Sequence, residues 1–197
     1  MNRTKKNLAF AALATVASVS LVIAQGPPPG GAKKGPAGPG LTLTTTAFAD
    51  GAEIPAKYTQ SDPMPVSPKL DWTNVPDGVQ SFVLHLHDPD VAIGPQFEDV
   101  LHWMAFNIPG EARSLPEGVA ANATLPDGTV QILNRGNKVG FMGPGAPPAG
   151  PHQHYTFELY ALDTKLSLPP TATRAEVLKA MEGHVRAKAV LVGRFHR

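Results

Sequence analysis

From residue 41 to the C-terminal Arg197, the chain repeatedly runs through a short apolar, β-branched stretch and then a turn of proline, glycine or aspartate. Such stretches are typical of β-strands joined by tight turns. The predicted strands are 41–48, 81–87, 102–108, 155–162 and 187–195. The sequence therefore predicts a mainly β fold, a β-sandwich or barrel with a few short helices at its periphery.

One segment, 173–182, has the pattern of a helix. Thr173 can cap its first turn, and Glu176 stands three residues later, as in a capping box. Gly183 ends it. A lone ten-residue helix is marginal in water, so its apolar face must be buried against the sheet. The side chains of that face are Val177, Leu178 and Met181.

The first forty residues have a different composition from the rest. Residues 1–24 combine a basic start, an apolar stretch and a small-residue exit ending at Ala24, which predicts a cleaved signal peptide. An uncleaved membrane anchor is the alternative, although 17 apolar residues are at the short limit for crossing a bilayer. Residues 25–40 are a Pro/Gly-rich linker, and 41–197 form the folded domain. We expect a periplasmic or secreted protein with no stable membrane insertion after cleavage.

Charge and cysteine content exclude several classes of function. Residues 41–197 hold 12 basic and 16 acidic residues, a net charge of −4. A slightly acidic body lacks the positive surface that binds nucleic acid non-specifically. The chain has no cysteine, which excludes disulfides, cysteine nucleophiles, cysteine-bound metal and a lipobox.

Polar residues that could carry chemistry stand at the ends of apolar strands. Asp88 and Asp90 flank a proline directly after one strand, and His102 opens another. A stiff loop of prolines and glycines, residues 143–151, leads into a third strand. Loops of this kind make good rims for pockets. Each signal has a structural reading as well, because Asp-Pro-Asp is commonly a turn and a lone histidine is commonly part of a core edge.

Taken together, in their order and spacing, these segments resemble the phosphatidylethanolamine-binding proteins. The resemblance is to the bacterial branch called YbhB/YbcL-like or Raf-kinase-inhibitor-like, and it covers the chain from Leu41 to Arg197. It rests on DPD at 88–90, HW at 102–103, GPGAPPAG at 143–150, HYTFELYALD at 154–163 and GHVRAKAVLVGRF at 183–195.

The resemblance implies a β-sandwich-like fold around a large antiparallel sheet, with a small cavity for phosphate-like anions or phosphoethanolamine head groups. It implies no catalytic residue and no cofactor. A further pocket histidine of the family would correspond to His152, Gln153 or His154, depending on the length of the loop. The ligand-binding residues implied are Asp88, Asp90, His102, Pro148, His152, His154 and Tyr155.

The residue types fit such a ligand on chemical grounds. His102, Tyr155 and N–H groups of the loop can donate hydrogen bonds to phosphate oxygens. An aspartate beside them would repel a polyanion unless it orients the histidine, takes a proton from the ligand or faces an ammonium group. The mixture therefore favours a zwitterionic or partly protonated ligand.

Three other readings remain. The pairs His85-x-His87 and His152-x-His154 resemble metal ligands, because alternate strand residues share a face, and they suggest a metal-binding enzyme. Glu98 is too far from the first pair for a cupin pattern. A hydrolase would lack a Gly-x-Ser-x-Gly elbow. An extracytoplasmic protease inhibitor is the third, since the family includes inhibitors that act by binding a protein partner.

Overall fold

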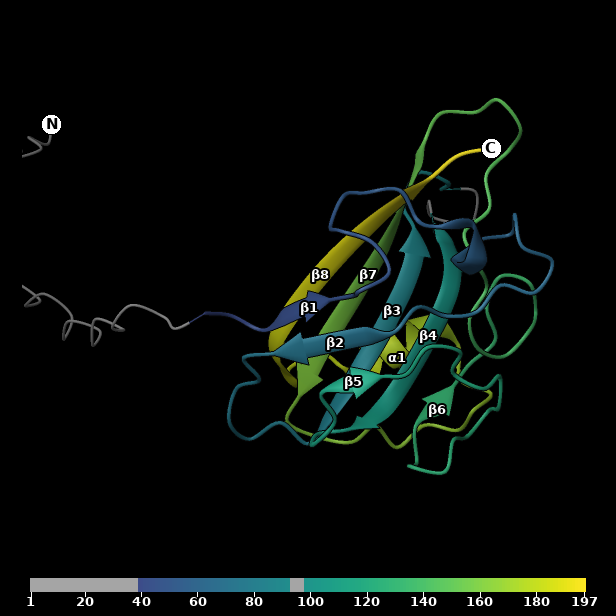
Figure 1. Cartoon of the computed structure of the whole chain (residues 1–197). Coiled ribbons are helices and arrows are strands. Elements are labelled where there is room, and N and C mark those ends of the chain that lie inside the picture. Colours follow the sequence, from purple (N-terminus) through teal and green to yellow (C-terminus); the bar gives the residue numbers. More distant parts are fainter. Residues whose placement is uncertain (1–38, 93–97) are drawn as a thin grey trace, which may run out of the picture. The chain divides into compact units, whose positions relative to one another are not determined.

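A computed structural model of the chain describes residues 39–92 and 98–197. It contains two antiparallel sheets and one α-helix in these residues (Figure 1). The expected signal peptide, 1–24, and most of the linker lie outside the described residues. The elements are β1 (Thr42–Thr44), a short 3-10 helix (Ala56–Tyr58), β2 (Leu70–Thr73), β3 (Ser81–Asp88), β4 (Val100–Pro109), β5 (Ser114–Leu115), β6 (Val130–Gln131), β7 (Gln153–Leu162), α1 (Arg174–Ala180) and β8 (Val185–Phe195).

The five-stranded sheet has the order β6-β4-β3-β7-β8, and the three-stranded sheet has the order β1-β2-β5. All pairings between these strands are antiparallel. The expectation of a mainly β, antiparallel sandwich-like fold is therefore confirmed.

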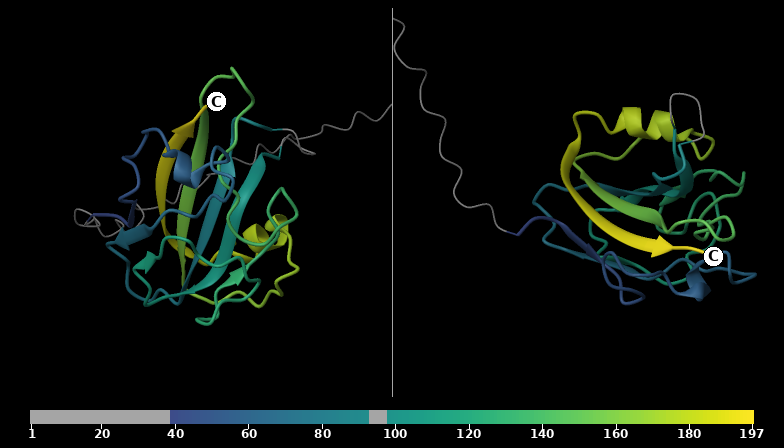
Figure 2. Two further views of the ribbon diagram at one scale, coloured as in Figure 1. Left: turned by 45° about the vertical axis from the view of Figure 1, so that its right-hand side comes forward. Right: turned by 90° about the horizontal axis from the view of Figure 1, so that it is seen from above.

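Both faces of the large sheet are covered, and each has its own apolar core. On one face, the three-stranded sheet and the segment after β1 bury side chains such as Trp72, Phe82 and Trp103. On the other face, α1 and the chain before it cover Val83 and Met104. Figure 2 shows the helix on one side of the sheet and the N-terminal strands on the other. Because both faces are buried, β3 reads as a nearly continuous apolar run instead of an alternating one.

The long strands were predicted within two residues of their observed bounds, but the short ones were not. β1 is only the first part of the predicted strand 41–48. After it the backbone no longer pairs with β2, and the side-chain Oγ1 of Thr45 donates to the carbonyl of Lys69 at 2.6 Å. Strands β2, β5 and β6 were not predicted, since two to four residues carry too little alternation to reveal a period.

The helix occupies the predicted place, with the capping box between Thr173 and Glu176. Its face differs in one respect from the prediction. Val177 and Met181 are buried at 0% and 3% exposure, whereas Leu178 lies at the margin of the core and is only partly buried. Within the described residues, no helix has the length and apolar character needed to cross a bilayer.

Candidate functional site

His102 occupies a β-bulge near the start of β4. The pairing of β3 with β4 passes from Leu86–Trp103 to His87–Leu101, so that His102 is an extra residue on β4. A bulge of this kind turns a side chain away from the direction that strict alternation would give it. The imidazole of His102 thereby lies edge-on to the ring of Tyr155, with the ring centroids 5.1 Å apart.

The ring of His102 is held through one nitrogen. Its Nδ1 lies 3.0 Å from the carbonyl oxygen of Met142, and because a carbonyl only accepts, Nδ1 carries the proton and donates it. The side chain is buried, and burial lowers its pKa from the ordinary value. The neutral ring therefore leaves Nε2 with a lone pair. This nitrogen can accept a hydrogen bond, whereas the sequence predicted that His102 acts as a donor.

Tyr155 joins the strand end to the proline-glycine loop. Its hydroxyl donates to the carbonyl of Gly145 at 2.7 Å and accepts from the N–H of Gly145 at 3.1 Å. Burial, followed by the nearby charge of Asp88, raises the pKa of the phenol well above its usual value. Tyr155 is therefore a neutral group that fixes the loop at this point.

Gln153 lies between the loop, Tyr155 and the acid. Its side-chain amide is oriented so that the nitrogen faces hydrogen-bond acceptors. That nitrogen lies 3.2 Å from Asp88 Oδ2 and 3.1 Å from both Gly145 O and the Tyr155 hydroxyl, and it donates to this group. Of the three positions left open by the sequence, Gln153 is the one beside these groups. Its place follows from strand alternation, because Gln153 and Tyr155 share a face of β7 and His154 points to the other.

Asp88 is the buried acid of the site, with 2% of its surface exposed. Its Oδ1 accepts from the backbone N–H of Asp90 at 3.0 Å, which is the Asx turn that Asp-Pro-Asp favours. Burial raises the pKa of this carboxyl, and the hydrogen bond from Asp90 only partly offsets that effect. Asp88 thus holds its proton more strongly than an exposed aspartate does.

Asp90 and His154 form a separate, exposed pair. Asp90 Oδ2 accepts from the backbone N–H of His154 at 2.7 Å and lies 2.9 Å from its Nδ1. Their side chains are 40% and 49% exposed. This pair ties the end of β3 to the start of β7 and stands at the edge of the site.

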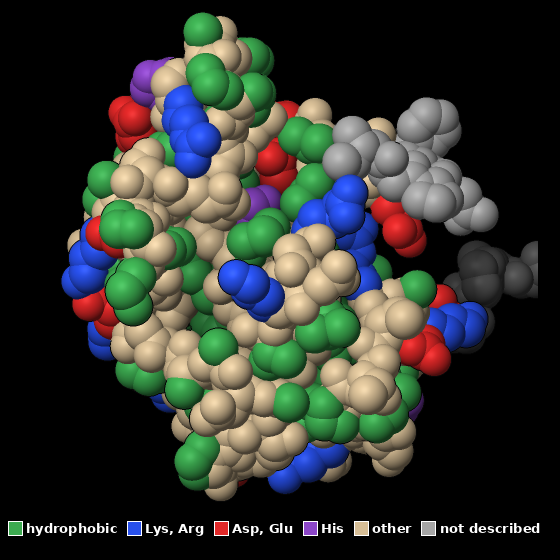
Figure 3. Space-filling view, turned by 90° about the vertical axis from the view of Figure 1, so that its right-hand side faces the viewer, with side chains coloured by type: hydrophobic (Ala, Val, Ile, Leu, Met, Phe, Trp, Pro, Cys, Tyr) green, Lys and Arg blue, Asp and Glu red, His purple; other side chains and the backbone are tan. Residues whose placement is uncertain are grey.

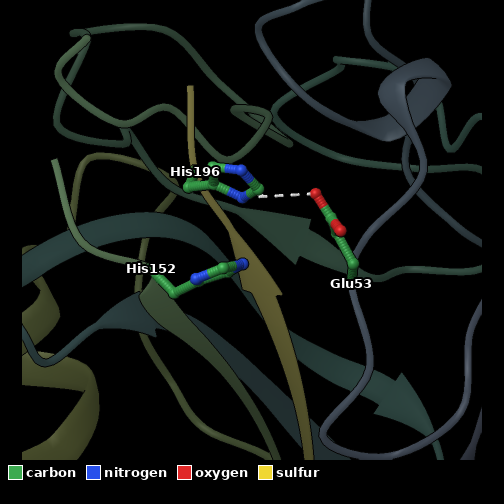
Figure 4. Close-up of side chains that lie close together, drawn as sticks. All are labelled: Glu53, His152 and His196. Atoms are coloured by element: carbon green, nitrogen blue, oxygen red, sulfur yellow. Dashed lines mark ion pairs between the residues drawn. The ribbon is translucent and has the colours of Figure 1, made fainter. Parts of the chain in front are cut away.

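His152 lies elsewhere, beside Glu53 and His196 (Figure 4). Its ring centroid is 4.1 Å from that of His196, whose Nδ1 is 3.3 Å from Glu53 Oε1. Pro148 is also exposed, at the tip of the loop. The structure therefore brings together Asp88, His102 and Tyr155, adds Gln153, and leaves His152 and Pro148 outside their hydrogen-bond network.

These groups meet at one end of the large sheet. Figure 3 shows, on one face of the molecule, a histidine at the bottom of a hollow with acidic atoms next to it. A groove of about 730 Å³ includes Met142 and Gly143 in its wall but none of Asp88, His102 and Tyr155. Chemically, the site offers a buried carboxyl whose pKa is raised and an imidazole nitrogen that can accept a hydrogen bond.

The comparisons with known proteins point to the same family. The family profile that matches residues 44–196 is described as phosphatidylethanolamine-binding protein. A UPF0098 protein of Methanothermobacter thermautotrophicus is 43% identical over 157 residues, which is 80% of this chain and 99% of that protein. A relative from Mycobacterium tuberculosis named as a lipoprotein, LppC, is 36% identical over 81% of this chain and 74% of its own. The crystal structure of Escherichia coli YbcL, titled as a new member of the mammalian PEBP family, is 27% identical, with a TM-score of 0.70 over 80% of this chain and 98% of that one.

Proposed function

The chain belongs to the phosphatidylethanolamine-binding protein family, and from that premise we propose that it binds a small phosphate-like anion or a phosphoethanolamine head group without catalysing a reaction. The proposed site is the strand-end group of Asp88, His102, Gln153 and Tyr155, with Asp90 at its edge.

The observation that carries the proposal is the fixed imidazole of His102. A structural histidine in a core would need both ring nitrogens satisfied by the fold. Here the bulge redirects the side chain of His102, and the carbonyl of Met142 fixes its Nδ1. That arrangement orients Nε2 as an acceptor, in the way that a backbone carbonyl orients the ring of a functional histidine.

The protonation states favour one form of the ligand. A neutral imidazole and a buried carboxyl bring no positive charge to the site, so the two charges of a phosphate dianion would be left uncompensated. The monoanion of the phosphate group carries only one charge and an O–H that can donate to His102 Nε2. The ammonium group of phosphoethanolamine would in turn be attracted to the exposed carboxylate of Asp90. The site therefore suits a ligand that brings a proton or a cation with its phosphate.

The side chains present support binding more than catalysis. The network contains no serine, and the chain has no cysteine. Ser67 and Ser81 are buried, and their hydroxyls are used in hydrogen bonds to the backbone. An acid and a histidine alone can move protons, but acyl transfer also needs a nucleophile.

We also propose that the protein acts outside the cytoplasm. The signal-like residues 1–24 motivate this, and the lipoprotein name of the mycobacterial relative is compatible with it. This chain has no cysteine to carry a lipid, so we expect a protein released after Ala24. Mass spectrometry of the protein from its native envelope tests this, and an intact, membrane-retained chain would contradict it.

The binding proposal predicts that His102→Gln weakens the binding of inorganic phosphate and of phosphoethanolamine. The loss should be about 1.5–3 kcal/mol, the range for a hydrogen bond to a charged group. Isothermal titration calorimetry near pH 6, where much of the phosphate is in its monoanionic form, measures it. The matched control is His184→Gln, which changes an exposed histidine near the opposite end of the sheet, paired with Asp163 at 2.8 Å.

Unchanged affinity in a folded His102→Gln protein would show that the ligand binds elsewhere or not at all. Equal weakening in His184→Gln would show that the effect is not specific to the proposed site. Comparing the two ligands separates recognition of the phosphate from recognition of the ammonium group, because only phosphoethanolamine should respond to Asp90→Asn.

A further inference from the structure

A second polar cluster lies on the opposite face of the large sheet from the proposed binding site. His85 and His87 project from β3 to the side that α1 covers, and Glu158 stands on β7 directly opposite His85. We call these three residues the histidine cluster. They are mostly buried, with side-chain exposures of 6%, 14% and 13%.

The donor atoms of the histidine cluster already converge. Glu158 Oε2 lies 3.3 Å from Nδ1 of His85 and 3.7 Å from Nε2 of His87. The two imidazole rings are stacked, with centroids 4.3 Å apart. Bonds of about 2.0–2.2 Å to a tetrahedral Zn²⁺ place neighbouring ligand atoms roughly 3.3–3.5 Å apart. The two distances to Glu158 are close to that spacing. Binding one ion also requires one imidazole to turn out of the stack, because parallel rings direct their lone pairs along parallel lines.

A second carboxylate orients one of the rings. Nδ1 of His87 lies 2.5 Å from Asp99 Oδ2, and Arg174 of α1 holds the same carboxylate. An imidazole whose Nδ1–H donates to a carboxylate presents the lone pair of Nε2, and most metal-binding histidines are oriented in this way. In His87 this lone pair faces the carboxylate of Glu158. Both the imidazole nitrogen and the carboxylate oxygen are then acceptors, and only a cation or a proton between them makes their contact favourable.

The ring nitrogen of His87 that faces Glu158 also lacks the partner that a purely structural role would require. This Nε2 is buried and has no hydrogen-bond partner among the residues that the structure describes. Unpaired polar atoms of this kind are rare in native interiors and call for a specific explanation.

We propose that His85, His87 and Glu158 bind a divalent first-row cation, for which Zn²⁺ is the best match. Two imidazoles and one carboxylate are a ligand set typical of zinc sites that keep a fourth position for water. This site is independent of the phosphate site, because the two lie on opposite faces of the sheet. Asp99 is its positioning residue.

Lys188 competes with the metal for Glu158. Its ammonium group lies 2.5 Å from Glu158 Oε1, the oxygen that does not face the histidines, while the hydroxyl of Tyr160 donates to Oε2 at 2.6 Å. The Lys188 side chain is 41% exposed, so it can move into solvent when a dication binds. Replacing this lysine should therefore strengthen metal binding, which a merely structural cluster would not do.

Zinc titration of the chelator-treated full chain tests the proposal. We expect one Zn²⁺ per chain, bound in the micromolar range or tighter. His87→Asn should abolish this binding, Asp99→Asn should weaken it by about 10–100-fold, and Lys188→Met should strengthen it by roughly fivefold. Co²⁺ as a probe should give the visible absorption of a four-coordinate site in the wild type but not in His87→Asn.

The exposed cluster of Glu53, His152 and His196 provides the control (Figure 4). A variant with His152→Asn and His196→Asn should keep the zinc site, and so should His102→Gln, whatever its effect on phosphate. Loss of zinc in the double variant together with retention in His87→Asn would overturn the proposal. So would the absence of zinc binding in the wild type. If His87→Asn does not fold, unchanged affinity in Lys188→Met decides against it.

Discussion

At the scale of single residues, the role of each histidine is decided by what surrounds its two ring nitrogens. His102 has Nδ1 fixed by a backbone carbonyl, and His87 has Nδ1 fixed by a carboxylate. His154 is exposed and bonded to Asp90. Sequence patterns place all three at strand ends or on strands but do not show these partners. The same residue type therefore serves as a candidate acceptor, a candidate metal ligand and a surface link.

The buried state of His102 predicts how stability depends on pH. Its pKa is lowered by burial, so the unfolded chain binds a proton more readily than the native one. The stabilisation from the neutral ring is fully present above the unfolded pKa of about 6.5. It is lost as pH falls towards and through the lowered native value. The unfolding free energy should thus decrease between pH 8 and pH 5.

Urea denaturation of the metal-free protein at several pH values measures this effect. His102→Gln should flatten the pH dependence, because the variant no longer has that proton to gain. His184→Gln, at an exposed position, should leave it as in the wild type. A pH dependence that is equally steep in His102→Gln and the wild type would mean that other groups cause it. One such group is His85, because burial lowers its pKa as well.

At the scale of elements, the bulge in β4 and the alternation of β7 build the candidate site. The sequence predicted both strands, but the bulge depends on how β4 pairs with β3, which no local pattern reveals. The choice of Gln153 over its two histidine neighbours follows from the alternation of β7, which places Gln153 and Tyr155 on one face of the strand. The sequence does not indicate Glu158 as a metal ligand, because it is 73 residues from His85. Spacing alone does not predict such a contact between strands.

The helix α1 provides a prediction at this scale. Val177 has 0% exposure and packs in the core between α1 and the large sheet, whereas Leu178 is only partly buried. Val177→Ala should lower the unfolding free energy by about 2 kcal/mol, since two buried methyl groups are lost and a cavity remains. Leu178→Ala should cost less, although it removes more carbon.

Thermal or urea denaturation of the two variants compares them directly, and phosphate affinity should stay unchanged in both. A larger loss of stability in Leu178→Ala than in Val177→Ala would mean that the helix is rotated relative to the arrangement described here. The sequence pattern places both residues on the apolar face of the helix and gives no order between them.

At the scale of the whole molecule, the sequence was sufficient for the class of fold and the place of its long elements. The short strands that form the second sheet follow from tertiary packing. Trp72 lies in such a strand, and it is buried because it faces Phe82 of the large sheet at a centroid distance of 5.3 Å. The segment from Phe48 to Ile54 is likewise irregular in sequence but is fixed against β8 by hydrogen bonds such as Ile54 N to Arg194 O, 2.8 Å.

The contact between that segment and β8 has a glycine at its centre, which gives a prediction for the assembled fold. A Cβ atom on Gly193 would lie 2.4 Å from Ile54 Cγ1 and 2.9 Å from Phe48 Cε2. Both neighbours are buried in the core between the sheets, so neither can move into solvent. Gly193→Ala should therefore lower the unfolding free energy by about 1–3 kcal/mol through overpacking.

Gly40→Ala is the matched control, because nothing lies within 4 Å of its added carbon. Denaturation curves of the two variants should separate clearly, and equal stability would show that the segment can move away from β8 without cost.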